Sequence, residues 1–209
     1  DYRRGQYENA RKKLQDYVGQ RLRFGGETPY KLLQDMMERA SAANADSDLS
    51  DKSDDDKDDK PAGVFIRFRD WLADDPTNLP LLSYVAEMTR RQGVLNDAIE
   101  LYEKSIEQRP TMKAYEQLLS LYKETNDNDK LLDLLATIVG EANDFTGFEN
   151  EIKSIAEDRE LVERLWKIGR ARLETDKAKA ALPRDMVVAC GLLALEVKAY
   201  AVADEFLGK

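Results

Sequence analysis

Two prolines place the strongest constraint on how this chain can fold. Pro76 and Pro110 are 34 residues apart, and the residues that precede each of them repeat in kind. Because proline cannot continue the helix behind it, each proline marks the end of a helix. A fixed period of this length is typical of stacked helical units. The spacing therefore predicts an all-α chain built from helix pairs.

The unit that ends at Pro110 carries small and bulky apolar residues at fixed positions, together with one threonine. These positions hold Leu82, Val85, Ala86, Thr89, Ala98 and Tyr102. Small residues let two antiparallel helices approach, while bulky ones fill the space beside them. Gly93 supplies the turn residue between the two helices. The pattern predicts one helix over residues 79–92 and a second over residues 96–108.

This skeleton resembles the tetratricopeptide repeat, with conservative replacements. Shifted copies of it fall in the segment that follows Pro110 and again near Cys190, so the resemblance covers roughly residues 1–17, 62–146 and 184–209. It implies an α-α superhelix, a TPR-like helical-repeat solenoid in which successive pairs share one continuous core. Arrays of this family are adaptor and assembly modules. The resemblance thus implies a surface that binds a protein or peptide partner.

The expected organisation has five segments, and the chain is expected to be a piece of a longer array. Two of these segments contain helices that fit the template poorly or incompletely, at 28–42 in the first and at 148–157 and 159–175 in the fourth. The segments are partial TPR-like helices at 1–45, a disordered acidic linker at 46–61, TPR-like repeats at 62–146, a degenerate helix pair at 147–183, and a truncated TPR-like repeat at 184–209.

The resemblance also implies a binding groove on the first helix of each pair. Carried over position by position, the groove residues are Ser83, Glu87, Arg90, Arg91, Gln117, Leu121, Glu124, Val188 and Leu192. Members of the family that clamp a terminal carboxylate use Lys and Asn where this chain has Ser83 and Glu87. We therefore do not expect it to bind acidic chaperone tails. Arg90 and Arg91 have a plainer interpretation, as solvated cations at a helix C-terminus.

The composition argues against catalysis and against metal or cofactor binding. The chain has no histidine and a single cysteine, Cys190, so the commonest general base and the thiolate clusters that bind metals are missing. The acidic run could suggest a calcium loop, but Asp51 and Lys57 stand where such a loop needs Gly and Glu. We expect no enzyme activity, no cofactor and no metal. Cys190, Trp71 and Trp166 are expected to lie in the core.

Charge and hydropathy limit the remaining partners. The net charge is −9, and residues 46–60 hold eight Asp against three Lys, so no concentrated positive face is expected for nucleic acid. The longest apolar stretch, 186–203, is interrupted by Glu196 and Lys198, which predicts no membrane insertion. Two alternatives to a peptide-binding groove remain. One is a homo-oligomeric scaffold formed through exposed repeat ends, and the other is a non-catalytic regulatory part of a larger enzyme.

Overall fold

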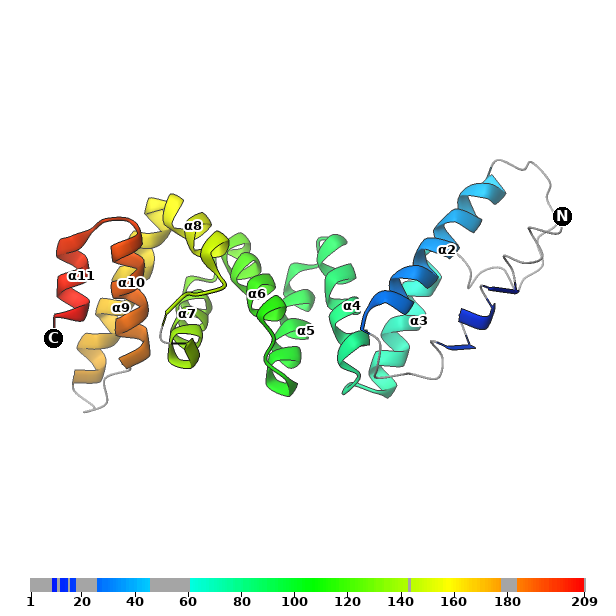
Figure 1. Cartoon of the computed structure of the whole chain (residues 1–209), viewed down its shortest axis with the longest axis horizontal. Coiled ribbons are helices and arrows are strands. Elements are labelled where there is room, and N and C mark those ends of the chain that lie inside the picture. Colours follow the sequence, from blue (N-terminus) through cyan, green and yellow to red (C-terminus); the bar gives the residue numbers. More distant parts are fainter. Residues whose placement is uncertain are drawn as a thin grey trace. The chain divides into compact units, whose positions relative to one another are not determined.

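The computed structural model describes residues 9–10, 12–14, 16–17, 26–45, 61–142, 144–177 and 184–208. The described residues are helical apart from short turns, and no strand occurs among them, so the predicted all-α class is confirmed (Figure 1). The predicted acidic linker and the rejected calcium loop lie outside the described residues. The chain divides into two compact units, Asp1–Arg109 and Pro110–Lys209.

Between residues 26 and 109, the described part of the first unit contains two helix pairs. Its helices are α2 (Thr28–Ala45), α3 (Pro61–Asp74), α4 (Leu79–Arg91) and α5 (Leu95–Gln108). Each helix packs against the next, and α2 also contacts α4. The helices predicted at 28–42, 79–92 and 96–108 are therefore present, with ends that differ by at most a few residues.

Aromatic packing joins α2, α3 and α4. The ring of Tyr30 on α2 stacks on Tyr84 of α4 at 5.7 Å between centroids, and Phe68 of α3 meets both rings edge-on. All three side chains are at most 2% exposed. Trp71 packs against Phe68 at the margin of this cluster, as expected for a core tryptophan. Edge and offset ring contacts of this kind add stability beyond the apolar area that they bury.

Local signals in the sequence fix both ends of α4. The buried side chain of Asn78 accepts a hydrogen bond from the backbone N–H of Leu81 at 3.2 Å, which caps the helix start. Gly93 has a φ of 78° in the turn that leads to α5. A residue with a β-carbon would be strained there. The α4–α5 hairpin is therefore the one that the repeat pattern predicts.

The second unit contains three successive pairs. Its helices are α6 (Met112–Thr125), α7 (Asn128–Ala142), α8 (Glu149–Glu157), α9 (Arg159–Lys177), α10 (Arg184–Glu196) and α11 (Tyr200–Leu207). Asn126 closes α6 in the left-handed region, with a φ of 57°. Asparagine adopts this conformation more readily than most residues with a β-carbon, and so it can end a helix in place of glycine. The helices predicted at 148–157 and 159–175 correspond to α8 and α9.

The packing of α10 departs from a simple succession of pairs. This helix contacts α7 extensively, and it also packs against α8, α9 and α11. Gly140 of α7 faces α10 at this contact, and a β-carbon there would lie 2.8 Å from the carboxylate of the exposed Asp185. Gly191 similarly faces the side chain of Leu207 on α11. A helix surrounded on several sides must be apolar on several sides, which explains the long apolar run that begins at Met186.

The α4–α5 contact yields a prediction about stability. Ala86 and Ala98 are both 0% exposed on helices that pack together, so Ala86→Leu has no space for three more carbons. Overpacking of this kind costs about 1–3 kcal/mol. Urea unfolding followed by circular dichroism should show a lower midpoint for this variant. As a control, Glu107→Leu at an exposed position of α5 should change stability by less than about 0.5 kcal/mol. Equal midpoints for all three proteins would contradict the close helix contact.

Candidate functional site

The predicted groove residues of the first unit lie along one side of α4. Ser83, Glu87 and Arg90 are partly exposed, and Arg91 is fully exposed. The Glu87 carboxylate lies 2.6 Å from the Arg91 guanidinium and 3.2 Å from the ammonium of Lys31 on α2. The structure therefore brings Glu87 and Arg91 together, and it adds a cation from the preceding pair that the sequence pattern did not indicate.

The charged residues on this side of α4 already form ion pairs with one another and with Lys31 of α2. Lys31 also lies 2.8 Å from Glu27. Its hydrogen bond to Glu27 raises the pKa of Lys31, and the bond to Glu87 adds to the rise, because both favour the charged ammonium. Arg90 has an interaction partner as well. A ligand on this surface would have to replace existing pairs, and exposed pairs of this kind contribute little stability individually.

Tyr102 lies on α5, the helix that pairs with α4. Its side chain is 2% exposed, and its hydroxyl has no hydrogen-bond partner within the described ranges. Burial raises the pKa of this phenol well above its usual value, and the nearby charge of Glu87 raises it further. The hydroxyl therefore stays protonated at physiological pH. Its ring fills the hairpin core, as the repeat skeleton predicts.

The predicted groove residues on α6, in the second unit, differ in their exposure. Gln117 is partly exposed and Glu124 is exposed, but Leu121 is 0% exposed. Helix α6 packs against both α7 and α8, and Lys123 donates to the carbonyl of Ser154 at 2.5 Å across the α6–α8 contact. Leu121 thus belongs to the core of its unit. It is not available as a binding residue, contrary to its place in the predicted groove.

Val188 and Leu192 form part of an apolar stripe on α10. Both are partly exposed, and Leu195, about one turn further on, is 43% exposed. The spacing of four and three residues puts the three side chains on one side of the helix. These residues belong to the second unit, and the α4 residues belong to the first.

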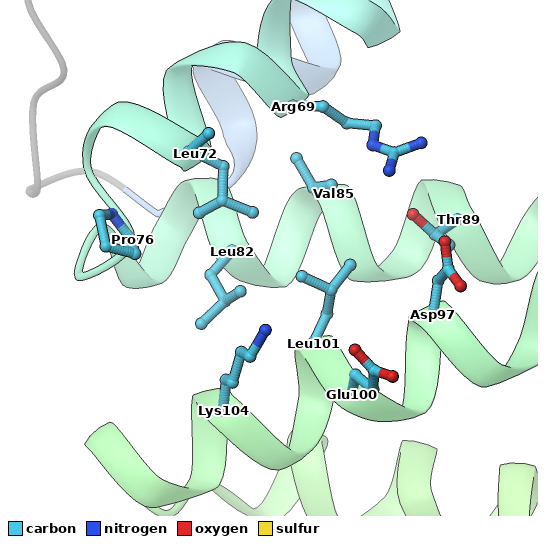
Figure 2. A pocket seen from close by; sticks show the side chains of 11 residues that line it. Arg69, Leu72, Pro76, Leu82, Val85, Thr89, Asp97, Glu100, Leu101 and Lys104 are labelled. Carbon is cyan, nitrogen blue, oxygen red and sulfur yellow. The ribbon is translucent and has the colours of Figure 1, made fainter.

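A cavity that the sequence pattern did not indicate lies within the first unit, between α3, α4 and α5 (Figure 2). Its volume is about 300 Å³. Leu82 and Val85 of α4 and Leu72 of α3 line it, and each is at most 8% exposed. Thr89, 5% exposed, extends this buried lining. The cavity is therefore open to solvent above an apolar floor.

Four exposed charged residues surround this floor. Arg69 comes from α3, whereas Asp97, Glu100 and Lys104 come from α5. Among the described residues, the side chains of these four take part in no hydrogen bond or ion pair. In Figure 2 the two carboxylates lie toward the Thr89 end, with Arg69 above them and Lys104 toward the Leu82 end. The cavity thus combines an apolar floor with charges that have no fixed partner in this part of the chain.

The sequence pattern missed this cavity because no single helix contains it. On α5 alone, acids three residues apart look like an ordinary solvated face. Their relation to Arg69 depends on the distance between α3 and α5, which the 34-residue period does not give. Two features of the sequence are related to the cavity. Leu82 and Leu101 belong to the two helices of one hairpin, and Pro76 follows the end of the preceding helix.

A second hollow, on the second unit, is a weaker candidate for a binding site because some of its charged residues are already paired. It lies beside Trp166 on α9 and Val202 on α11, and its volume is about 630 Å³. Two of its cations are already paired, because Arg170 binds Glu205 through two hydrogen bonds of 2.7 and 2.8 Å and Arg164 lies 3.8 Å from Glu160. Trp166 itself is 8% exposed and so is part of the core, as predicted.

Two structural findings bear on metal and membrane binding. Within the described ranges, no group of three or more acidic or cysteine side chains is arranged to hold a metal ion. The helices of the same ranges also lack the combination of length and apolarity that crossing a bilayer requires.

No protein-family model matches the chain, and no curated protein matches it either. The tetratricopeptide resemblance therefore rests on the residue pattern alone.

Cys190 gives a prediction about pH. It is 1% exposed on α10, and burial raises the pKa of its thiol to about 12 from an ordinary value of 9.0. The unfolded chain therefore loses this proton first as the pH rises. Between about pH 9 and 12 the thiol should lower the free energy of unfolding by about 1.4 kcal/mol per pH unit.

Comparison with Cys190→Ala isolates this effect, because the lysines and tyrosines that titrate in the same range are common to both proteins. The difference in unfolding free energy between the original chain and the variant should be constant below pH 8 and should shrink above pH 9. A difference that does not change up to pH 11 would show that the thiol is accessible in the folded state.

Proposed function

We propose that this protein is a binding module for other proteins, built from helical repeats of the tetratricopeptide kind. The observation that carries the proposal is the cavity between α3, α4 and α5, whose floor is apolar and whose charged residues have no fixed partner within the described ranges. The apolar surface that a ligand could reach in the cavity comes from Leu101, which is partly exposed, and from Ala73 and Pro76, which are exposed. Accessible apolar surface bordered by polar residues is typical of interaction sites. A segment of a partner protein would cover this floor.

The α4–α5 hairpin supports the choice of family. Ala86 and Ala98, the small residues of the repeat skeleton, are fully buried, and Gly93 adopts the turn conformation that the skeleton needs. In a tetratricopeptide array such hairpins stack into a superhelix that displays its outer residues to partners. The cavity carries the proposed function, and a fold of this kind is compatible with a partner-binding role.

The proposal also keeps most of the groove residues implied by the resemblance, as separate surfaces on each unit. On α4 these are Ser83, Arg90 and Arg91, with Glu87 as the anion that positions Arg91 and Lys31. Gln117, Glu124, Val188 and Leu192 stay in the proposal for the second unit, whereas Leu121 is withdrawn because it is buried. The partner is a protein or peptide, and no cofactor or metal is part of the proposal.

A second candidate function is self-association into a structural scaffold. The stripe of Val188, Leu192 and Leu195 on α10 favours it, because three apolar side chains in a row are accessible on one helix. Light scattering over a range of concentrations distinguishes the two functions. A dimer that Leu195→Lys converts to a monomer would favour the scaffold, and a monomer at all concentrations would exclude it.

The binding function can be tested by selecting peptides on the immobilised full chain from a displayed random library. We expect enriched peptides that Ala73→Trp no longer captures, because Ala73 lines the cavity and is exposed, so that the indole can fill the cavity without disturbing the core. Ala201→Trp, at an exposed position on α11, is the matched control and should keep full capture.

The same selection tests the α4 surface. Charge reversal of Arg90 and Arg91 to Glu should reduce capture several-fold, and reversal of the exposed Lys153 and Arg159 should leave it unchanged. If no peptide is enriched on the original chain, the binding function is wrong. If enrichment occurs but survives the Arg90 and Arg91 reversal, only the α4 assignment is wrong.

A further inference from the structure

We infer that the cavity between α3, α4 and α5 takes an apolar side chain of a partner segment and that a basic side chain next to it in that segment binds Asp97 and Glu100. This inference rests on the proposed function and deepens it by naming the chemistry of the ligand. It does not depend on the tetratricopeptide resemblance, since the cavity is defined by the side chains of three adjacent helices.

The apolar part of the ligand follows from the floor. Leu82 and Val85 are 1% exposed and form a closely packed base. The accessible apolar lining comes from Leu101, Ala73 and Pro76. A volume of about 300 Å³ is at the lower limit of small-molecule pockets. It holds one or two large aliphatic or aromatic side chains. A single buried anchor of this kind commonly supplies most of the affinity at an interface.

The basic part follows from how the charges are placed. Asp97 and Glu100 are three residues apart on α5, so their carboxylates lie on the same side of one helix and point to the same end of the cavity (Figure 2). Arg69 and Lys104 lie on different helices and do not converge on one point (Figure 2). Both carboxylates therefore lie toward the Thr89 end of the cavity, where Arg69 lies above them, whereas Lys104 lies toward the Leu82 end (Figure 2). A ligand cation could contact two carboxylates at the Thr89 end of the cavity, whereas a ligand anion could contact only one cation at either end.

The positive charge of Arg69 opposes the proposed ligand cation, which gives a further way to test the inference. Arg69 lines the cavity from α3, above the two carboxylates, and has no ion pair within the described part of the chain. Its positive charge weakens the attraction of a second cation at this end. Removal of this charge should therefore strengthen binding of a basic ligand, which is the reverse of what loss of a ligand-binding residue would do.

The experiment uses small capped peptides as probes and the full chain as receptor. N-acetyl-leucyl-arginine amide carries both required groups, N-acetyl-leucyl-glutamate amide reverses the charge, and N-acetyl-glycyl-arginine amide lacks the apolar group. Titration followed by amide NMR shifts should show the first probe moving resonances of Leu82, Val85 and Leu101. The glutamate probe should bind up to about fivefold more weakly, the scale of an exposed charge contact. The glycyl probe should bind at least about tenfold more weakly, because it has no leucine side chain to bury.

Three variants test the named residues. Glu100→Lys should weaken the leucyl-arginine probe roughly fivefold to tenfold, and Arg69→Gln should strengthen it. Glu107→Lys makes the same charge change at an exposed position of α5 that does not line the cavity, and it should have little effect. Amide spectra of all three variants show directly whether each remains folded.

Two results would overturn the inference. Equal binding of the arginine and glutamate probes, or an acidic preference, would show that the cavity does not select a cation. Shifts confined to residues outside α3, α4 and α5 would show that the cavity is not the site. Neither result would contradict the proposed binding function, because that function is tested by a separate experiment, the enrichment of displayed peptides on the full chain.

Discussion

The structure depends on helices that cannot be stable alone. Helices α4 and α5 have 13 and 14 residues, a length at which isolated helices are marginal in water. Each must therefore bury an apolar face against a neighbour. The close contact made possible by Ala86 and Ala98 satisfies this need for the central hairpin of the first unit, and the ring cluster around Tyr84 joins the same hairpin to α2 and α3.

This requirement also explains where the candidate site lies. When helices pack side by side, the neighbours of each helix cover its sides. A hollow remains wherever two helices on the same side do not meet. Helices α3 and α5 both pack on α4, and the cavity lies between the three. Its apolar floor is simply the outer edge of the core. The charges around it come from the exposed sides of α3 and α5, which explains how apolar and ionic groups come to lie side by side.

Much of the helical pattern could be predicted from the sequence, because proline, glycine and small residues act locally. Pro76 and Gly93 mark helix ends, and the alanines mark contacts, so the bounds of α4 and α5 were predicted to within a few residues. The site was harder, since it depends on distances between helices. Leu121 illustrates this point. Its position in the repeat implied an open groove, yet α6 packs against two other helices and the side chain is buried.

The position of α10 has a consequence for how the chain acquires its structure. In the first unit each helix finds its partner in the next one along the chain, so the unit can form step by step. Helix α7 packs against α10, with α8 and α9 between them in sequence. Contacts between distant segments slow folding, because the loop must close before they contribute. During synthesis the part of α7 that α10 covers stays exposed until α10 has emerged, so the packing of α7 is completed only then.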